Sequence, residues 1–318
     1  MTVVVIGGTG HIGSFLVPRL VEAGHHVLCV SRRQRSPYVS HDAWNRVEHA
    51  VIDRGRAESE GQFGRAIAAL VPEIVVDLTC YTVESATQLA EALTGRVAHL
   101  LHCGTIWVHG PGGAVPTTED EPRRPFGDYG RRKAAIERYL IDLTKHGSLP
   151  STVLHPGHLV GPGWMPINPA GNFDVKVFDD LGNGRLVRLP QPGTATLHHV
   201  HVDDVAQAFV QAIAHPRVSI GESFHVVSPR AMTMREYADQ MADWFGTGPT
   251  LQWLPYAEWR ADVSERDAAI TLDHIQHSSN CSIDKARARL GYAPRYDSLA
   301  AVQESVAWLM RNRTPRPV

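Results

Sequence analysis

The chain has 318 residues, 43% of them hydrophobic and 20% charged, which is enough for one large α/β unit or about two domains. This composition excludes a disordered chain, a collagen-like repeat and a coiled coil. With 31 Lys and Arg residues against 33 Asp and Glu residues, the formal net charge is −2. Such a balance gives no overall positive field for nucleic acid or an anionic membrane, so a small molecule is the expected ligand.

The sequence carries no signal for a membrane segment or a disulfide framework. No apolar run approaches the ~18 residues of a membrane span, and the apolar run Val3–Ile6 is not preceded by a basic leader. We therefore expect a cytoplasmic protein with no membrane partner. Its four cysteines are scattered, and we expect buried free thiols rather than disulfides or metal ligands at Cys29, Cys80, Cys103 and Cys281.

The first half alternates short apolar runs with segments of helical periodicity, which is typical of a parallel sheet with crossover helices. The predicted strands are Val3–Ile6, Val27–Val30, Val47–Val51, Ile74–Leu78 and Ala98–Cys103. The predicted helices are Ile12–Ala23, Phe63–Leu70, Ala86–Leu93 and Lys133–Leu143. Because strands without polar residues are buried on both faces, the sequence predicts an α/β fold with a doubly wound parallel sheet.

After about residue 155, prolines and glycines interrupt the pattern, which indicates a smaller, loop-rich C-terminal lobe. Regular helix or strand patterns return at Val202–Ala214, Ser223–Val227, Met234–Phe245, Asp284–Leu290 and Leu299–Met310. We expect residues 1–155 to form one domain that also receives the segments around 200–230. Residues 156–199 and 231–318 would form the second lobe.

Three glycines, Gly7, Gly10 and Gly13, follow the first predicted strand and open the first helix. Glycine permits a tight turn and a close approach of the backbone to a pyrophosphate, whose charge is stabilised by the free N–H groups of the helix. The spacing therefore predicts a dinucleotide site in the first domain and leaves the second lobe for the substrate. The cofactor contacts expected in this turn are Gly7, Thr9, Gly10, His11, Ile12 and Gly13.

The end of the second predicted strand indicates which dinucleotide binds. A protein that binds NAD usually places Asp or Glu there against the ribose diol, but this chain has Ser31, Arg32 and Arg33. Ser31 can hydrogen-bond and Arg32 can pair with a phosphorylated adenosine, so NADP is favoured over NAD. The alternative is that both arginines are solvated loop charges. Asp53, after the third strand, would bind the adenine amino group or form a turn.

Tyr129 and Lys133 lie four residues apart at the start of a predicted helix, so their side chains share one face. A phenol has an ordinary pKa of about 10, but a nearby ammonium favours its phenolate form. Such a pair can move a proton to or from a substrate hydroxyl. The alternative is an ordinary pair on a helix surface.

Together with these glycines and the Tyr129–Lys133 pair, further segments make the chain resemble an extended short-chain dehydrogenase/reductase of the NAD(P)-dependent epimerase/dehydratase family. These segments are Gly104–Gly110, Leu154–Gly157, Gly161–Gly163, His201–Val205 and Leu290–Pro294. The resemblance covers nearly the whole chain. It implies a Rossmann-like fold, a NAD(P) cofactor and a small-molecule substrate, and it suggests a homodimer.

The resemblance also implies residue roles. Thr105 would hydrogen-bond the reacting carbonyl or alcohol, although Gly104 stands where the family commonly has serine. Tyr129 would be the acid/base, and Lys133 would hold the nicotinamide ribose and lower the pKa of the tyrosine. Because ligands of doubly wound sheets lie at the carboxyl ends of the strands, the remaining expected cofactor contacts are Leu78, Thr79, Cys80, Pro156 and His158.

Departures from the family bear on the substrate. Ile106 and Trp107 stand where 4,6-dehydratases have Asp-Glu, and apolar side chains cannot supply that acid and base, which argues against a 4,6-dehydratase. Leu197 and His158 occupy positions where many UDP-sugar epimerases have an Arg for the diphosphate and an Asn. Residues that could still hold a diphosphate, or be ordinary surface charges, are Lys176, Arg185 and Arg188.

The expected substrate pocket is lined by aromatic and imidazole side chains, namely Tyr81, Trp107, His109, His158 and Trp164. Such a pocket suits a sugar or another polyol-like ring, and equally an aromatic or terpenoid ketone. His109 or His158 could act as an auxiliary proton donor. No carboxylate or cysteine with ligand spacing accompanies His198, His199 and His201, so we expect no metal.

The sequence favours the first of three functions and leaves the other two as alternatives. The first is an epimerase-type enzyme, in which hydride leaves a secondary alcohol of a sugar-like compound for the nicotinamide and then returns. The second is a net NADP(H)-dependent ketone reductase or alcohol dehydrogenase acting on a non-nucleotide substrate. The third is a non-catalytic dinucleotide sensor or RNA-binding relative, which is disfavoured because the Tyr129–Lys133 pair is intact.

Overall fold

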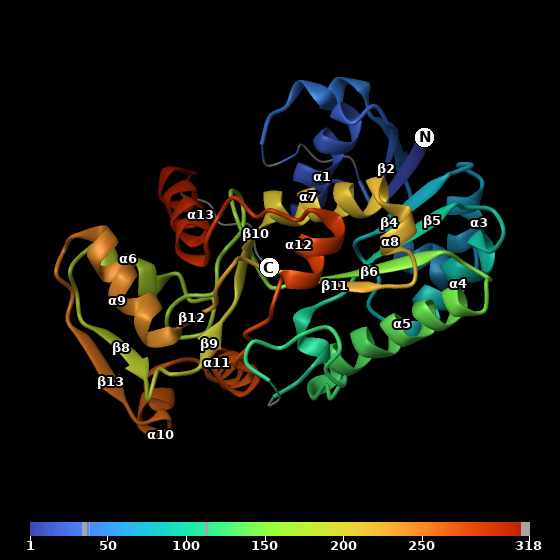
Figure 1. Cartoon of the computed structure of the whole chain (residues 1–318). Helices are drawn as coiled ribbons and strands as arrows, with labels where there is room; N and C mark the ends of the chain where they lie inside the picture. The colour runs from blue at the N-terminus through green and yellow to red at the C-terminus, as the bar shows by residue number, and fades with distance from the viewer. Residues whose placement is uncertain (34–36, 38, 112–113, 313–318) are drawn as a thin grey trace.

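The computed structural model describes residues 1–33, 37, 39–111 and 114–312. A parallel sheet is layered between helices and lies beside a smaller lobe of short strands and helices (Figure 1). This arrangement confirms the predicted fold class, a Rossmann-like doubly wound sheet with a second lobe. The exact domain boundaries stay a prediction.

The central sheet has seven parallel strands in the order β11-β6-β5-β4-β1-β2-β3. Their bounds are β1 Thr2–Ile6, β2 His26–Ser31, β3 Glu48–Val51, β4 Ile74–Asp77, β5 His99–Cys103, β6 Ser151–Pro156 and β11 Ser223–Val226. Central strands are buried on both faces, as the sequence predicted, and Val3, Val4 and Val5 are 0% exposed. The edge strand β3 differs, because most of its residues are exposed.

Helices cover both faces of the sheet. Those that pack together on one face are α1 His11–Glu22 and α7 Val202–Ala214. Those on the other face are α3 Phe63–Ala68, α4 Val83–Leu93 and α5 Gly127–Lys145. Shorter helices connect the elements, namely η1 Asp42–Arg46, α2 Arg54–Ser59, η2 Ile106–Val108, α8 Pro216–Ser219 and α12 Asp284–Leu290.

Helix α5 starts earlier than the sequence predicted. It begins at Gly127 rather than at Lys133, and Asp128 in its first turn interacts favourably with the positive end of the helix dipole. Tyr129 and Lys133 therefore both lie on the helix, one turn apart.

The lobe has its own hydrophobic core around Phe178, Tyr237 and Trp259. Its strands pair two by two, as β7 His158–Val160 with β10 His199–His201, β8 Val187–Pro190 with β13 Leu251–Leu254, and β9 Thr196–Leu197 with β12 Met232–Thr233. Its helices are α6 Lys176–Gly182, α9 Met234–Phe245, α10 Tyr256–Trp259, η3 Arg260–Asp262, α11 Glu265–His277 and α13 Ser298–Asn312.

The sequence analysis missed α11, although a signal for it was present. The hydroxyl of Ser264 accepts the N–H of Asp267 at 3.0 Å and donates to its carboxylate at 2.6 Å, a reciprocal cap at the helix N-terminus. The buried residues then recur at helical spacing, as Ala268, Thr271, His274 and His277. Three of these four are polar, which hid the buried face from a search for apolar residues.

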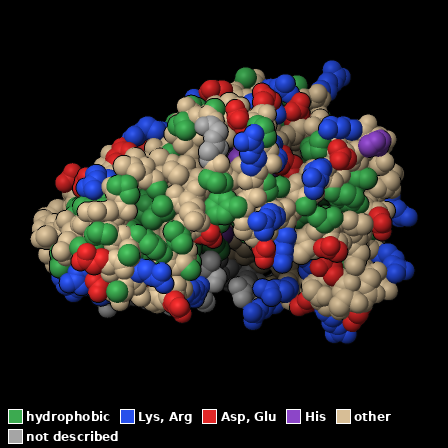
Figure 2. Space-filling view, turned by 90° about the horizontal axis from the view of Figure 1, so that it is seen from below, with side chains coloured by type: hydrophobic (Ala, Val, Ile, Leu, Met, Phe, Trp, Pro, Cys, Tyr) green, Lys and Arg blue, Asp and Glu red, His purple; other side chains and the backbone are tan. Residues whose placement is uncertain are grey.

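The helices, the surface charges and the cysteines can be compared with what the composition led us to expect. No helix among the described residues is long and apolar enough to cross a membrane. Basic and acidic side chains are interspersed over the face shown in Figure 2, as expected from a net charge of −2. The four cysteines are free and buried, as predicted, and burial raises the pKa of each thiol.

Candidate functional site

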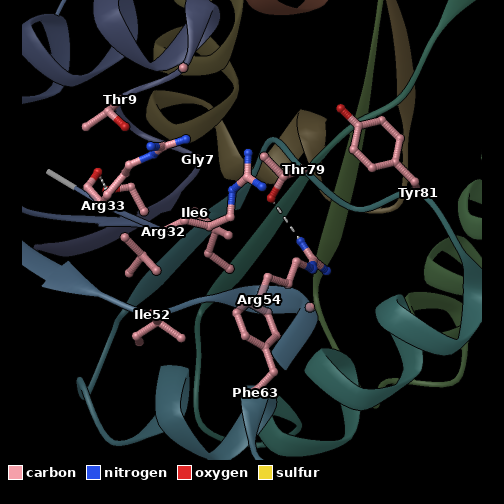
Figure 3. Close-up of a pocket in the computed structure, with 14 residues that line it drawn as sticks. Ile6, Gly7, Thr9, Arg32, Arg33, Ile52, Arg54, Phe63, Thr79 and Tyr81 are labelled. Atoms are coloured by element: carbon pink, nitrogen blue, oxygen red, sulfur yellow. Dashed lines mark hydrogen bonds between the residues drawn. The ribbon is translucent and has the colours of Figure 1, made fainter. Parts of the chain in front are cut away.

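A groove of about 440 Å³ lies at the carboxyl ends of β1, β2 and β4, where the strand order reverses between β1 and β4. In a doubly wound sheet, this switch point is where a dinucleotide binds. The side chains drawn in Figure 3 reach the groove from several strand ends and from α2 and α3. The predicted cofactor contacts that line it are Gly7, Thr9, Gly10, Ser31, Arg32 and Thr79.

The glycine turn brings the backbone close to this groove. Gly7 has a φ of +84°, and a Cβ there would lie 2.5 Å from Cγ2 of Thr79. A Cβ on Gly13 would lie 2.3 Å from the carbonyl oxygen of Gly8, so α1 packs directly on the turn. The N-terminus of α1 has neither a side-chain cap nor an acid in its first turn, which leaves its N–H groups for an anion. The turn fits the pyrophosphate of a dinucleotide.

The groove is positively charged beside the end of β2. Arg32 and Arg33 line it, and neither takes part in an ion pair with another described residue. Ser31 turns its hydroxyl to the carbonyl oxygen of Arg33 at 2.9 Å. No Asp or Glu lines the groove within the described parts of the chain. The groove therefore offers positive charge, and no acid from its described lining, beside the place expected for the adenosine ribose.

After β3, the expected contact of Asp53 with the adenine amino group is replaced by a turn. Asp53 accepts the N–H of Arg56 at 3.0 Å and caps α2, which is the turn-forming alternative. Arg54, which the sequence did not single out, lines the groove and donates to Asp77 at 2.7 Å. It also donates to Thr79 at 3.1 Å (Figure 3). Arg54 also pairs with Glu58 one turn later at 2.7 Å, but the partners that turn it toward the groove, Asp77 and Thr79, are more than twenty residues away, so the local pattern did not identify it.

Lys133 is buried between the sheet and α5. Its ammonium donates to the carbonyl oxygens of Cys80 at 2.8 Å and Cys103 at 2.7 Å, beyond β4 and at the end of β5. The nitrogen also lies 4.8 Å from the centre of the Tyr81 ring. Burial lowers the pKa of Lys133 below its usual value. The two carbonyl bonds compensate for part of the cost of burying the ammonium.

Thr105 and Tyr129 meet beside this lysine, as the sequence predicted. The hydroxyl of Thr105 accepts the N–H of Trp107 at 3.3 Å and lies next to the phenol of Tyr129. Burial raises the pKa of Tyr129, and the neighbouring Thr105 lowers it less, so the phenol keeps its proton at neutral pH. The pair is therefore poised to hydrogen-bond one oxygen atom together.

A buried chain of polar groups supports the backbone of Thr105. Its N–H donates to Nδ1 of His155 at 3.0 Å, which assigns the ring proton to Nε2, 3.1 Å from Oε1 of Glu137. Arg123 donates to the same oxygen at 2.6 Å. Burial opposes the charge on Glu137, but His155 and Arg123 outweigh it and hold the pKa of this carboxyl well below its usual range.

The position of His155 explains why a glycine precedes Thr105. A Cβ on Gly104 would lie 2.3 Å from Nδ1 of His155 and 3.0 Å from Cγ1 of Val153. Any side chain at this position would displace the imidazole. Glycine in place of serine at this position therefore makes room for the imidazole of His155.

A second cavity, of about 340 Å³, is lined by Thr105 and Tyr129 on one side and by residues of the lobe on the other. Three of the predicted substrate residues, Trp107, His158 and Trp164, line it. Burial and neighbouring histidines lower the pKa of His158 well below its ordinary value, so the ring is neutral. Lining residues that the sequence did not single out are Leu159, Ile167, Phe173, Ile270, Asp273 and His274.

Stacked rings hold the aromatic wall of this cavity in place. The Trp107 ring stacks on His277 with centroids 3.7 Å apart, and the other side of His277 stacks on Phe126 at 3.9 Å. His11, expected as a cofactor contact, instead stacks on Trp164 at 4.6 Å. His277 lies on α11, which the sequence did not predict, so the sequence could not predict this stacked wall either.

The structure leaves other predicted contacts outside both cavities. His109 is buried, with its Nε2 2.8 Å from Nε2 of His225, and does not reach the substrate cavity. Tyr81 lines the dinucleotide groove instead of the substrate cavity. Predicted cofactor contacts that line neither cavity are His11, Ile12, Gly13, Asp53, Leu78, Cys80, Lys133 and Pro156.

One group of possible metal ligands occurs among the described residues, and an arginine already binds its carboxylate. Asp77, Cys80 and His102 have ligand atoms within 4.8 Å of one another, but Arg54 binds the Asp77 carboxylate at 2.7 Å. The histidines near residue 200 belong to no such group among the described residues. His198 instead accepts the N–H of Cys281 at 3.1 Å.

The three basic residues that could have held a diphosphate are paired with acids of the lobe. Lys176 and Arg185 both pair with Asp180, and Arg188 lies 3.1 Å from Asp262. None of them lines the substrate cavity. They behave as surface charges, which was the alternative stated from the sequence.

Known proteins share this architecture. The profile of the NAD dependent epimerase/dehydratase family matches residues 3–226. The chain is 26% identical over 271 residues to a 2'-dehydrokanamycin reductase of Streptomyces kanamyceticus, covering 83% of this chain and 72% of that protein. It is 26% identical over 328 residues to a dTDP-6-deoxy-L-talose 4-dehydrogenase (NAD(P)(+)) of Kitasatospora kifunensis, covering 98% and 96%.

A solved structure is similar over the full length. The UDP-glucose 4-epimerase of Thermotoga maritima superposes with a TM-score of 0.75 and 20% identity, covering 99% of this chain and 100% of that chain. Both the profile match and this fold agree with the resemblance seen in the sequence. The chain therefore belongs to the NAD dependent epimerase/dehydratase family and is an NAD(P)-dependent enzyme of that type.

Proposed function

We propose that the protein is an NADP(H)-dependent oxidoreductase that interconverts a secondary alcohol and a ketone on a small, ring-shaped substrate without a nucleotide. One observation carries the proposal: Thr105 and Tyr129 together line the substrate cavity, and Lys133 is buried behind them near the dinucleotide groove. Residues 1–155 with the segments around 200–230 would hold the dinucleotide. The segments 156–199 and 231–318 would hold the substrate.

The proposed roles follow from the protonation states. When bound, the nicotinamide supplies or accepts the hydride, so that ketone, reduced dinucleotide and a proton give alcohol and oxidised dinucleotide, or the reverse. Tyr129 keeps its proton at neutral pH and can donate it to the carbonyl oxygen of a ketone. Thr105 donates a second hydrogen bond to that oxygen, and the ammonium of Lys133 stabilises the phenolate left on Tyr129.

The substrate cavity supports a substrate without a diphosphate. No Lys or Arg is among the described residues that line it, and two phosphates would need cationic partners to leave water. The lining is instead aromatic and aliphatic, apart from the reacting pair, two neutral histidines and Asp273. A single ring with a carbonyl or hydroxyl group fits this composition.

The unpaired arginines beside the end of β2 support NADP and thereby a net redox reaction. An enzyme that consumes its dinucleotide must exchange it at every turnover, whereas an epimerase keeps it through the cycle. An epimerase-type reaction would use the same Thr105, Tyr129 and Lys133. We also propose a cytoplasmic location and a homodimer, both on the family resemblance.

Tyr129→Phe removes the proposed proton donor without removing the ring. We expect kcat to fall by about a hundredfold or more, because general acid catalysis contributes about that factor, with the Kd for NADPH unchanged. Steady-state kinetics and fluorescence titration measure the two quantities. Tyr139→Phe, on the same helix but outside the cavity, serves as the control. Full activity of the Tyr129 variant would show that the tyrosine is not the acid/base.

Arg32→Ala tests the identity of the dinucleotide. A charge-assisted bond to phosphate is worth about 1.5–3 kcal/mol, so the Kd for NADPH should rise about tenfold or more and that for NADH by much less. Calorimetry with both dinucleotides gives the ratio. Arg65→Ala is the control, since Arg65 is exposed and lines neither cavity. An equal loss of affinity for NADPH and NADH would show that Arg32 does not bind the phosphate of NADPH.

Gly104→Ala tests the support of Thr105. The new methyl group overlaps His155 and should lower the free energy of unfolding by about 1–3 kcal/mol, the usual cost of overpacking, while also slowing turnover. Denaturant unfolding and kcat measure the two effects. At Gly55, a Cβ would meet nothing closer than 3.6 Å, so Gly55→Ala should not be destabilising. Unchanged stability of the Gly104 variant would contradict the contact with His155.

A further inference from the structure

We propose that the substrate carries an ammonium group and that Asp273 on α11 binds it at the mouth of the substrate cavity. This inference deepens the proposed function and rests on it, because it names the chemistry of the compound that would reach Thr105 and Tyr129. It also identifies a specificity-determining residue in a part of the chain where the family resemblance implies none.

The charge of the substrate cavity is the first observation that supports a cationic substrate. Asp273 is its one charged side chain among the described residues, and no Lys or Arg joins it there. Burial lowers the pKa of both His158 and His274, so neither ring contributes a positive charge at neutral pH. The site therefore has a net negative charge, which attracts a cation and repels an anion.

The state of the carboxylate is the second support. Asp273 uses only its backbone carbonyl oxygen, which accepts from Nδ1 of His277 at 2.8 Å. Its carboxylate has no ion pair or hydrogen bond to any residue that the structure describes. By contrast, Asp180 and Asp262 in the same lobe are paired with basic side chains. An incoming ammonium would supply the partner that the chain itself does not.

Exposure makes such an ion pair favourable. Asp273 is exposed, so its carboxylate stays hydrated until the ligand arrives, and a bound ammonium can keep part of its own hydration shell. The cost of removing charges from water is therefore small compared with that of a fully buried pair.

The aromatic lining is the third support. Trp107, Trp164 and Phe173 line the same cavity, and the negative faces of aromatic rings attract cations. Stacking on His277 and His11 fixes the two tryptophan rings, so they form a prearranged wall. An ammonium next to Asp273 would thus gain from both the carboxylate and the rings.

The geometry sets the size of the substrate. Asp273 comes from the lobe, whereas Thr105 and Tyr129 come from the sheet side, so a substrate that touches all three bridges the two parts. The cavity of about 340 Å³ holds one substituted ring. An amine-bearing cyclic alcohol or ketone, such as an amino sugar, matches these limits.

The experiment compares matched ring compounds with and without the charge. Calorimetry on the full chain saturated with NADP would measure the Kd of 2-, 3- and 4-aminocyclohexanol and of their N-acetyl derivatives. We expect at least one amine to bind about fivefold to tenfold more tightly than its acetamide, the combined effect of a partly exposed ion pair and ring contacts. Asp273→Asn should abolish this preference, and Asp239→Asn, an exposed carboxylate outside the cavity, should keep it.

Each other result overturns the inference. The carboxylate of Asp273 does not bind an ammonium if every acetamide binds as tightly as its amine or more tightly. The same conclusion follows if no amine binds measurably, or if the preference for the amine survives in Asp273→Asn. Tighter binding of UDP-glucose than of any amine would do the same. Repeating the titrations without dinucleotide keeps the tests separate, because a failure to bind NADP would end the proposed function and leave the amine comparison intact.

Discussion

The buried ammonium of Lys133 is the interaction on which the reacting centre depends. It ties α5 to the carbonyl oxygens of Cys80 and Cys103, at the carboxyl ends of neighbouring strands. A buried charge must find hydrogen-bond partners, so this contact fixes the helix against the sheet. Tyr129, one turn earlier on the same helix, is thereby held against Thr105, which follows β5.

The two cavities carry opposite charges, and this contrast organises the function. Unpaired arginines face the dinucleotide groove, whereas the substrate cavity holds one carboxylate among aromatic and aliphatic side chains. Helix α1 adds its positive end to the groove. The proposed NADP and the proposed uncharged or cationic substrate would thus be directed to adjacent places, with Thr105 and Tyr129 lining the substrate cavity.

The sequence predicted the sheet well because its signal is local. Apolar runs such as Val3–Ile6 are buried strands, and the glycine turn and the Tyr129–Lys133 spacing place groups that the chain itself brings together. The rest depends on distant contacts. The choice of Gly104 is understood only once His155, about fifty residues later, is seen to occupy its side-chain space. Likewise, Asp273 reaches the cavity on a helix whose buried face is largely polar.

Whether the enzyme exchanges NADP(H) in a net redox reaction is decided by the dinucleotide that it carries and binds. The purified protein would be denatured, any released dinucleotide identified, and the dinucleotide-free chain titrated with NAD, NADP and their reduced forms. We expect little retained dinucleotide, readily reversible binding of NADP(H) and much weaker binding of NAD(H). Tightly retained NAD would instead indicate an epimerase that keeps its dinucleotide and would refute the proposed net redox reaction.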